Sequence, residues 1–108
     1  MALQVAEFSF EMIAAVRPLV ARIRRHDRSL ADQLVRAASS VALNIGEADV
    51  SDPGNQRARF FTAAGSANEA LAALRVAVAW GYIPEADAAE GSALLRRIVA
   101  MLWKLARR

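Results

Sequence analysis

Hydrophobic residues recur every three or four positions in four segments of the chain, a spacing typical of amphipathic helices. The first segment covers residues 3–25, and Pro18 inside it predicts a kink or a break, because proline lacks the amide hydrogen of a regular helix. The second covers residues 29–48, where Ser29 and Asp32 resemble a capping box at the start of a helix. The rows that we expect to face a core are Val5, Phe8, Met12, Val16, Leu19 and Ile23, and then Leu34, Ala38, Val41 and Ile45.

The other two segments, residues 53–80 and 84–107, are delimited by turn and capping residues. Asp52 followed by Pro53 is typical of a helix start, and Gly81 is suited to the left-handed position that ends a helix. The expected core rows are Phe60, Ala64, Ala67, Leu71, Leu74 and Val78, and then Leu94, Ile98, Met101 and Leu105. Short connections between long helices predict an all-α fold, an antiparallel up-down-up-down four-helix bundle that forms a single domain over residues 1–108.

The first and last segments carry more apolar residues than one buried face needs. A helix that buries one face shows an apolar stripe about 100° wide, and these two are wider. A small bundle that left such rows exposed would present an apolar patch of a size that monomers rarely tolerate. We therefore expect a homo-oligomer, although the same residues would also suit an unusually apolar monomer core. The expected interface residues are Phe10, Ile13, Val20, Leu95, Val99, Leu102 and Trp103.

Composition excludes several kinds of site. The 108 residues are 56% hydrophobic, above the roughly 45–50% of an average domain, so disorder is excluded. With no cysteine and one histidine, thiolate or multi-histidine metal sites and cysteine nucleophiles are excluded, and we expect no metal and no cofactor. No apolar run reaches the roughly 18 residues of a membrane span, and a basic leader is missing. We therefore expect a cytoplasmic protein without a membrane partner.

The net charge of +3 is unevenly distributed. Two clusters of bases stand near the ends of the first and last helices, which lie at opposite poles of an antiparallel bundle. Arginine clusters neutralise nucleic-acid phosphates, and an oligomer would repeat such patches. The alternative is that these cations complement helix dipoles and keep the protein soluble, with Glu85 and Asp87 partly cancelling the first cluster. The first cluster is Arg22, Arg24, Arg25, His26 and Arg28, and the second is Arg96, Arg97, Lys104, Arg107 and Arg108, with Arg57 and Arg59 as further candidates.

Polar residues interrupt the helices of residues 29–48 and 53–80 where the pattern favours apolar ones. If the two helices pair about the loop between them, Arg36 reaches Glu69, and an ion pair there would fix their register. No nucleophile–base couple, pair of catalytic carboxylates or glycine-rich phosphate loop can be assembled, so we expect no enzyme. The expected polar network is Arg36, Ser40, Asn44, Glu47, Ser66 and Glu69.

At these same positions the sequence resembles a known family. Residues 35–48, VRAASSVALNIGEA, are similar to the R-A-x-x-S-I-x-x-N-I-A-E-G motif of the bacterial four-helix bundle proteins. Residues 59–69, RFFTAAGSANE, are similar to that family's R-F-x-x-x-A-x-G-S-x-x-E. Gly46 and Ala48 depart from the pattern, and Asp49 and Asp52 replace residues that are often basic.

Members of this family include proteins encoded in intervening sequences of large-subunit ribosomal RNA genes, once called S23 ribosomal proteins. The accessory variability determinant of diversity-generating retroelements is a relative. The resemblance implies a homopentameric ring and no enzymatic activity. For the retroelement relative it implies binding of nucleic acid and a reverse transcriptase. The motif residues correspond to Arg36, Ser40, Asn44, Glu47, Gly65, Ser66 and Glu69.

Taken together, the sequence predicts a non-enzymatic homo-oligomeric bundle that binds RNA or DNA through arginine patches. The alternative is a protein-interaction scaffold that binds no nucleic acid. A peripheral membrane binder with a basic amphipathic helix is a third and weaker interpretation.

Overall fold

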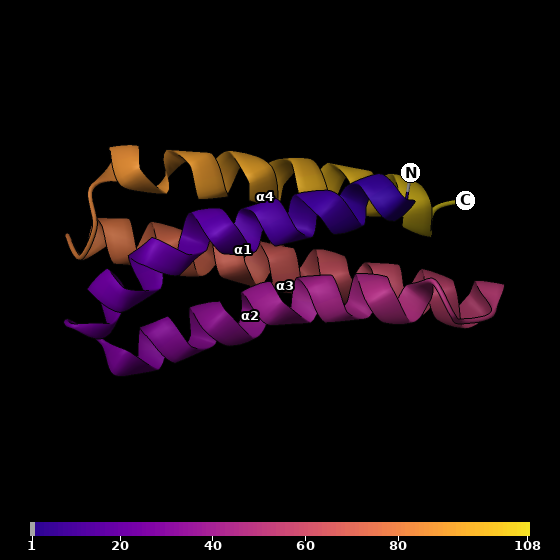
Figure 1. Cartoon of the computed structure of the whole chain (residues 1–108), viewed down its shortest axis with the longest axis horizontal. Coiled ribbons are helices and arrows are strands. Elements are labelled where there is room, and N and C mark those ends of the chain that lie inside the picture. Colours follow the sequence, from indigo (N-terminus) through magenta and orange to yellow (C-terminus); the bar gives the residue numbers. More distant parts are fainter. Residues whose placement is uncertain (1) are drawn as a thin grey trace.

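Four helices arranged as an antiparallel bundle make up the computed structural model, which describes residues 2–108. They are α1 (Ala2–Arg24), α2 (Arg28–Ala48), α3 (Pro53–Ala79) and α4 (Glu85–Ala106). The α1–α2 and α3–α4 connections lie at one end of the bundle, and both chain termini lie at the other (Figure 1). Each helix packs against two neighbours, in the cyclic order α1, α2, α3, α4. The predicted up-down-up-down bundle is thus confirmed, and α1 continues without a break through the exposed Pro18.

Helix α2 begins one residue earlier than the sequence predicted. The Asp27 carboxylate accepts a hydrogen bond of 3.0 Å from the Leu30 amide, so Asp27 and not Ser29 caps the helix. Asp32, the other half of the predicted capping box, forms an ion pair with Arg24 instead. The prediction was wrong because the chain turns tightly after α1, where the amides of His26 and Asp27 both donate to the Ile23 carbonyl.

Helix α3 begins at Pro53, as the sequence indicated, and ends at Ala79, one residue earlier than predicted. The Asp52 carboxylate accepts a hydrogen bond of 3.0 Å from the Asn55 amide, and Pro53 occupies the first turn. At the other end Gly81 has a φ of 79°, the left-handed conformation that glycine adopts without a steric penalty. The Gly81 amide donates to the Val78 carbonyl and the Tyr82 amide donates to the Ala77 carbonyl. These two bonds form a Schellman motif, which reverses the chain toward α4.

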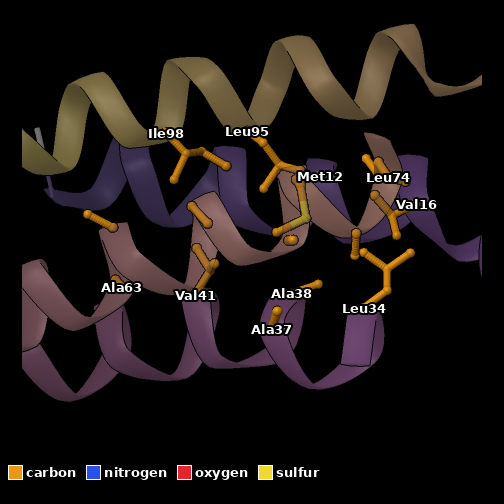
Figure 2. Packing of buried hydrophobic residues seen from close by; sticks show 14 of the residues in the cluster. Met12, Val16, Leu34, Ala37, Ala38, Val41, Ala63, Leu74, Leu95 and Ile98 are labelled. Atoms are coloured by element: carbon orange, nitrogen blue, oxygen red, sulfur yellow. The ribbon is translucent and has the colours of Figure 1, made fainter. Parts of the chain in front are cut away.

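The core contains large side chains from three helices and mainly small ones from α3 (Figure 2). Met12 and Val16 of α1 meet Leu34 of α2 and Leu95 of α4 in the middle of the bundle. Helix α3 contributes Phe60 and Leu74, and its remaining buried residues are the alanines Ala63, Ala64, Ala67, Ala70, Ala73 and Ala77.

The buried row of α4 differs from the predicted one, and two predicted interface residues belong to it. Leu95 and Leu102 are fully buried inside the monomer, whereas Leu94 and Met101 are only half-buried. The assignment of Leu95 and Leu102 to an oligomer interface was therefore wrong. Helix α4 has two adjacent apolar rows with the same spacing, so the spacing alone does not show which row is buried. The buried row continues through Gly91, a small residue that the hydrophobic pattern does not reveal. A Cβ atom at Gly91 would lie 3.1 Å from the Val16 side chain, so α4 approaches α1 closely there.

Candidate nucleic-acid interface

The bundle has four long sides, each formed by two adjacent helices, and their exposed residues differ in chemistry. We call them the α1/α2, α2/α3, α3/α4 and α4/α1 sides. The predicted site residues are spread over these sides and the two ends, because successive residues of a helix point about 100° apart. Their distribution decides which charges act together.

The first predicted arginine cluster lies at the end that carries the α1–α2 and α3–α4 connections. Arg22 forms an ion pair of 2.7 Å with Asp87 of α4, one of the two acids that were expected to cancel part of this cluster's charge. Arg24 pairs with Asp32, and its hydrogen bond holds the pKa of that carboxyl below its ordinary value. Arg25 and Arg28 are exposed and form no ion pair within residues 2–108. Two of the four arginines of this cluster are thus paired with carboxylates of the same chain.

The second predicted cluster does not form a single patch. Arg97 covers the ring of Phe8 at 4.3 Å and lines a groove on the α4/α1 side together with Glu11 and Glu90. Arg96 points to the other flank of α4, where it lines a groove of the α3/α4 side with Arg75. The prediction of one surface was wrong, because adjacent residues of a helix point in different directions. Arg96 faces the α3 flank and Arg97 faces the α1 flank. Lys104 is exposed and lies seven positions after Arg97 in α4, whereas the exposed Arg108 lies beyond the end of the helix.

The α3/α4 side combines four exposed arginines with two aromatic rings. Arg57 and Arg75 come from α3, Arg96 comes from α4, and Arg107 directly follows α4. None of the four forms an ion pair within the described chain. Glu85, at the far end of the groove that holds Arg75 and Arg96, is the acid that accompanies them. The side is therefore strongly basic.

The two aromatic residues lie between these arginines. Phe61 and Trp103 pack edge to face with ring centroids 5.2 Å apart, and the Arg107 guanidinium lies 5.2 Å from the centre of the Trp103 ring. Phe61 and Arg75 were not among the predicted site residues. The signal was present, because residues 57, 61, 68 and 75 share one face of a helix by their spacing. Trp103, predicted as an interface residue, belongs to this side.

Part of the predicted polar network forms on the α2/α3 side, where four of its six residues are joined: Ser40, Asn44, Glu47 and Ser66. The hydroxyls of Ser40 and Ser66 are 2.8 Å apart, and the Asn44 amide donates to both the carbonyl and the hydroxyl of Ser40. Arg59 extends the network, since it donates to the Asn44 side-chain oxygen at 3.4 Å and pairs with Glu47 at 2.8 Å. The network thus joins α2 to α3 by direct hydrogen bonds. Arg59, predicted as a further candidate of the second basic cluster, belongs to this network instead.

The predicted Arg36–Glu69 ion pair does not form. Both side chains are exposed and line the same groove as Ser40 and Ser66, but no ion pair joins them. Exposed ions gain little from pairing because water solvates each of them well. The register of α2 against α3 is instead marked by the Ser40–Ser66 contact.

The α1/α2 side is apolar. Ile13, Val20 and Val35 line a groove there with Arg17 as its one charged residue. Phe10, one turn before Ile13, leaves 58% of its surface exposed. Three predicted interface residues, Phe10, Ile13 and Val20, are therefore at the surface on this side, whereas the half-buried Val99 lies on the flank of α4 that faces α3.

The structure offers neither a metal site nor a membrane-spanning segment within residues 2–108. No three His, Cys, Asp or Glu side chains of this part of the chain come together as metal ligands would. None of the helices that it forms has the length and apolar character needed to cross a bilayer.

Comparisons with known proteins agree with this architecture. A family model described as "23S rRNA-intervening sequence protein" matches residues 1–104. The crystal structure of a protein of unknown function from the S23 ribosomal protein family of Bacteroides thetaiotaomicron VPI-5482 is similar to this chain, with a TM-score of 0.88. The two sequences are 19% identical, and the similarity covers 96% of this chain and 99% of that one. No curated protein matches the sequence.

Proposed function

The chain belongs to the 23S rRNA-intervening sequence protein family, and we propose that it is a non-enzymatic, homo-oligomeric bundle that binds nucleic acid. The observation that carries this proposal is the α3/α4 side, where Arg57, Arg75, Arg96 and Arg107 stand without ion pairs beside two aromatic rings. We assign the interface to this side in place of the two end clusters.

The chemistry of this side suits a phosphate backbone. The guanidinium group carries a permanent charge and a planar fork of donors that matches phosphate oxygens. Arg57 and Arg75 are 18 residues apart in one helix, which corresponds to about 27 Å at 1.5 Å per residue. A row of this length contacts several successive phosphates.

Self-association is the second part of the proposal. The apolar groove of the α1/α2 side, with the exposed Phe10 beside it, is the kind of surface that marks protein interfaces. The family resemblance implies five subunits. In a ring, where the α1/α2 side of each subunit contacts a different surface of the next subunit, the α3/α4 sides are repeated, so that weak contacts to one nucleic acid add as avidity.

The test is binding of labelled RNA and DNA, measured by fluorescence anisotropy over a series of salt concentrations. Affinity should fall steeply with salt, because each neutralised phosphate releases counterions. Replacing Arg57 and Arg107 by Gln should lower the slope of log affinity against log salt by about one for each lost contact. Arg36→Gln, which removes an exposed arginine of the α2/α3 side, is the matched control and should leave the slope unchanged.

Two outcomes would contradict the proposal. Equal losses in the Arg57/Arg107 and Arg36 variants would remove the α3/α4 side as the interface. Absence of binding at low ionic strength, together with a protein partner that survives nuclease treatment, would favour the alternative of a protein-interaction scaffold.

A further inference from the structure

Three aromatic rings stack on the α1–α2 and α3–α4 connections. Both connections lie at the same end of the bundle, on the left in Figure 1. His26 of the first connection lies against Tyr82 of the second, with ring centroids 4.9 Å apart and planes within 6°. Tyr82 in turn lies near Trp80, with centroids 6.5 Å apart and planes within 16°. The result is a short ladder of nearly parallel rings with Tyr82 in the middle.

The backbone of the α3–α4 connection builds this ladder. Gly81, at a φ of 79°, separates the two aromatic residues and turns the chain back on itself. The bond from the Tyr82 amide to the Ala77 carbonyl, 2.9 Å long, then holds Tyr82 in place. Residues 80 and 82 are thereby brought onto one surface.

Anchoring the connection does not explain Trp80. Ile83 is 2% exposed and fixes this segment to the core, whereas Trp80 leaves 71% of its surface in solvent. Trp80 is thus a large ring at the end of an ordered stack, and most of its surface is open to solvent. It is also a ready platform on which another flat ring can stack.

The charges around the ladder suit an anionic ligand. Arg25 and Arg28 flank His26 in sequence, are exposed and form no ion pair within the described residues. Three of the four acids at this end are engaged: Asp27 caps α2, and the carboxylates of Asp32 and Asp87 pair with arginines. Glu85 is the fourth. Arg25 and Arg28, next to His26 in the chain, therefore remain available to a phosphate.

We propose that the His26–Tyr82–Trp80 ladder binds an unpaired nucleobase, which stacks on Trp80 while Arg25 and Arg28 contact the adjoining phosphates. Bases stack on aromatic side chains in a sequence-tolerant manner, because every base has a flat π face. A base inside a duplex already stacks on its neighbours, so the ladder selects single strands and loops. This inference rests on the proposed function. It adds a preference for unpaired bases, which the arginines of the α3/α4 side do not supply because they contact only phosphates.

The first experiment monitors Trp80 directly. In a Trp103→Phe background, Trp80 is the one tryptophan, and its fluorescence reports a base stacked on it. The probes are an unstructured 12-nucleotide RNA, the DNA of the same sequence, the matching duplex, and an abasic oligomer with the same number of phosphates. We expect quenching by the RNA or the DNA single strand, and none by the duplex or the abasic oligomer.

The second experiment measures affinity. Trp80→Leu should weaken binding of the single strand about tenfold, in the range measured for the loss of one stacked base, and change duplex binding less than twofold. Val50→Ala, at an exposed apolar residue near the opposite end, is the control and should change neither affinity. Circular dichroism confirms that both variants keep the helical fold.

The outcomes separate this inference from the proposed function. If Trp80→Leu weakens single strand and duplex equally, or weakens neither, the ladder is not a base-binding site. The same conclusion follows if the abasic oligomer quenches Trp80. In these cases the proposed function survives as long as the arginine variants of the α3/α4 side lose affinity. If the wild-type protein binds none of the probes, the proposed function itself is wrong.

Discussion

The α1/α2 and α3/α4 sides enclose the same core, yet they offer opposite chemistry to solvent. The first presents Ile13, Val20 and Val35 around a single arginine, Arg17. The second presents four arginines and the Phe61–Trp103 pair. Packing of the core does not require this difference, because the core needs only the buried residues of each helix and not the exposed residues beside them. The residues just outside the buried stripes therefore indicate what each side contacts.

The difference originates in the composition of the helices. Helix α1 continues its apolar face beyond the core, because Ile13 and Val20 stand next to the buried Met12, Val16 and Leu19. The core face of α3 is formed mostly by alanines, with arginine and aromatic side chains on its flank. An apolar flank favours a second protein surface, whereas a basic flank favours an anion.

The largest expected effect is the loss of stability when a core residue is truncated, compared with a residue on one of the sides. Leu95→Ala should lower the free energy of unfolding by about 2–5 kcal/mol, because Leu95 is fully buried and its removal leaves a cavity. Val99→Ala, one turn further along on the α3-facing flank, should cost less than about 1 kcal/mol, since Val99 is only half-buried. Urea denaturation measures both. Similar losses in the two variants would show that the boundary between core and side is misplaced.

The next effect tests the apolar side. A charge placed at an apolar interface must be desolvated on association, so Phe10→Glu should lower self-association at least tenfold without unfolding the subunit. Phe10 is 58% exposed, which is why the single chain should tolerate the change. Analytical ultracentrifugation across a dilution series measures the mass, with Val50→Glu as the control. A wild-type protein that sediments as a folded single chain would remove the interface altogether.

The smallest effect concerns the start of α3, where the basic side begins. The backbone and side-chain hydrogen bonds from Asn55 hold the pKa of Asp52 below its ordinary value of 3.8. A carboxyl whose pKa is lowered in the folded state adds stability above the ordinary value, and this is lost as pH falls through the lowered pKa. Thermal melts below pH 4 should therefore show a small loss of stability.

Asp52→Asn serves as the matched control for that measurement. Asparagine is also a good cap but does not titrate. This variant should keep most of the cap and flatten the part of the pH dependence that Asp52 contributes. An unchanged pH profile in the Asn variant would assign the effect to other carboxyls, such as Asp32, whose pKa the hydrogen bond from Arg24 lowers.

Much of the fold could be predicted from the sequence, but the candidate site could not. Helix bounds and the turn at Gly81 follow from local rules, so they were predicted within a few residues. The two arginine clusters were grouped by their proximity in sequence, and this grouping failed for Arg96 and Arg97. Asp27 was missed as a cap because Ser29 offered an equally good local pattern two residues later.

By itself, the sequence determined four amphipathic helices, their order and the cap at the start of α3, because these depend on residues within a turn or two of one another. Tertiary structure decided which of two apolar rows of α4 was buried, and which arginines were neutralised by Asp32 and Asp87. It also brought His26 against Tyr82 across 56 positions of the chain. Rotation of a helix about its axis leaves its local pattern unchanged, so only its neighbours determine the direction in which each side chain points.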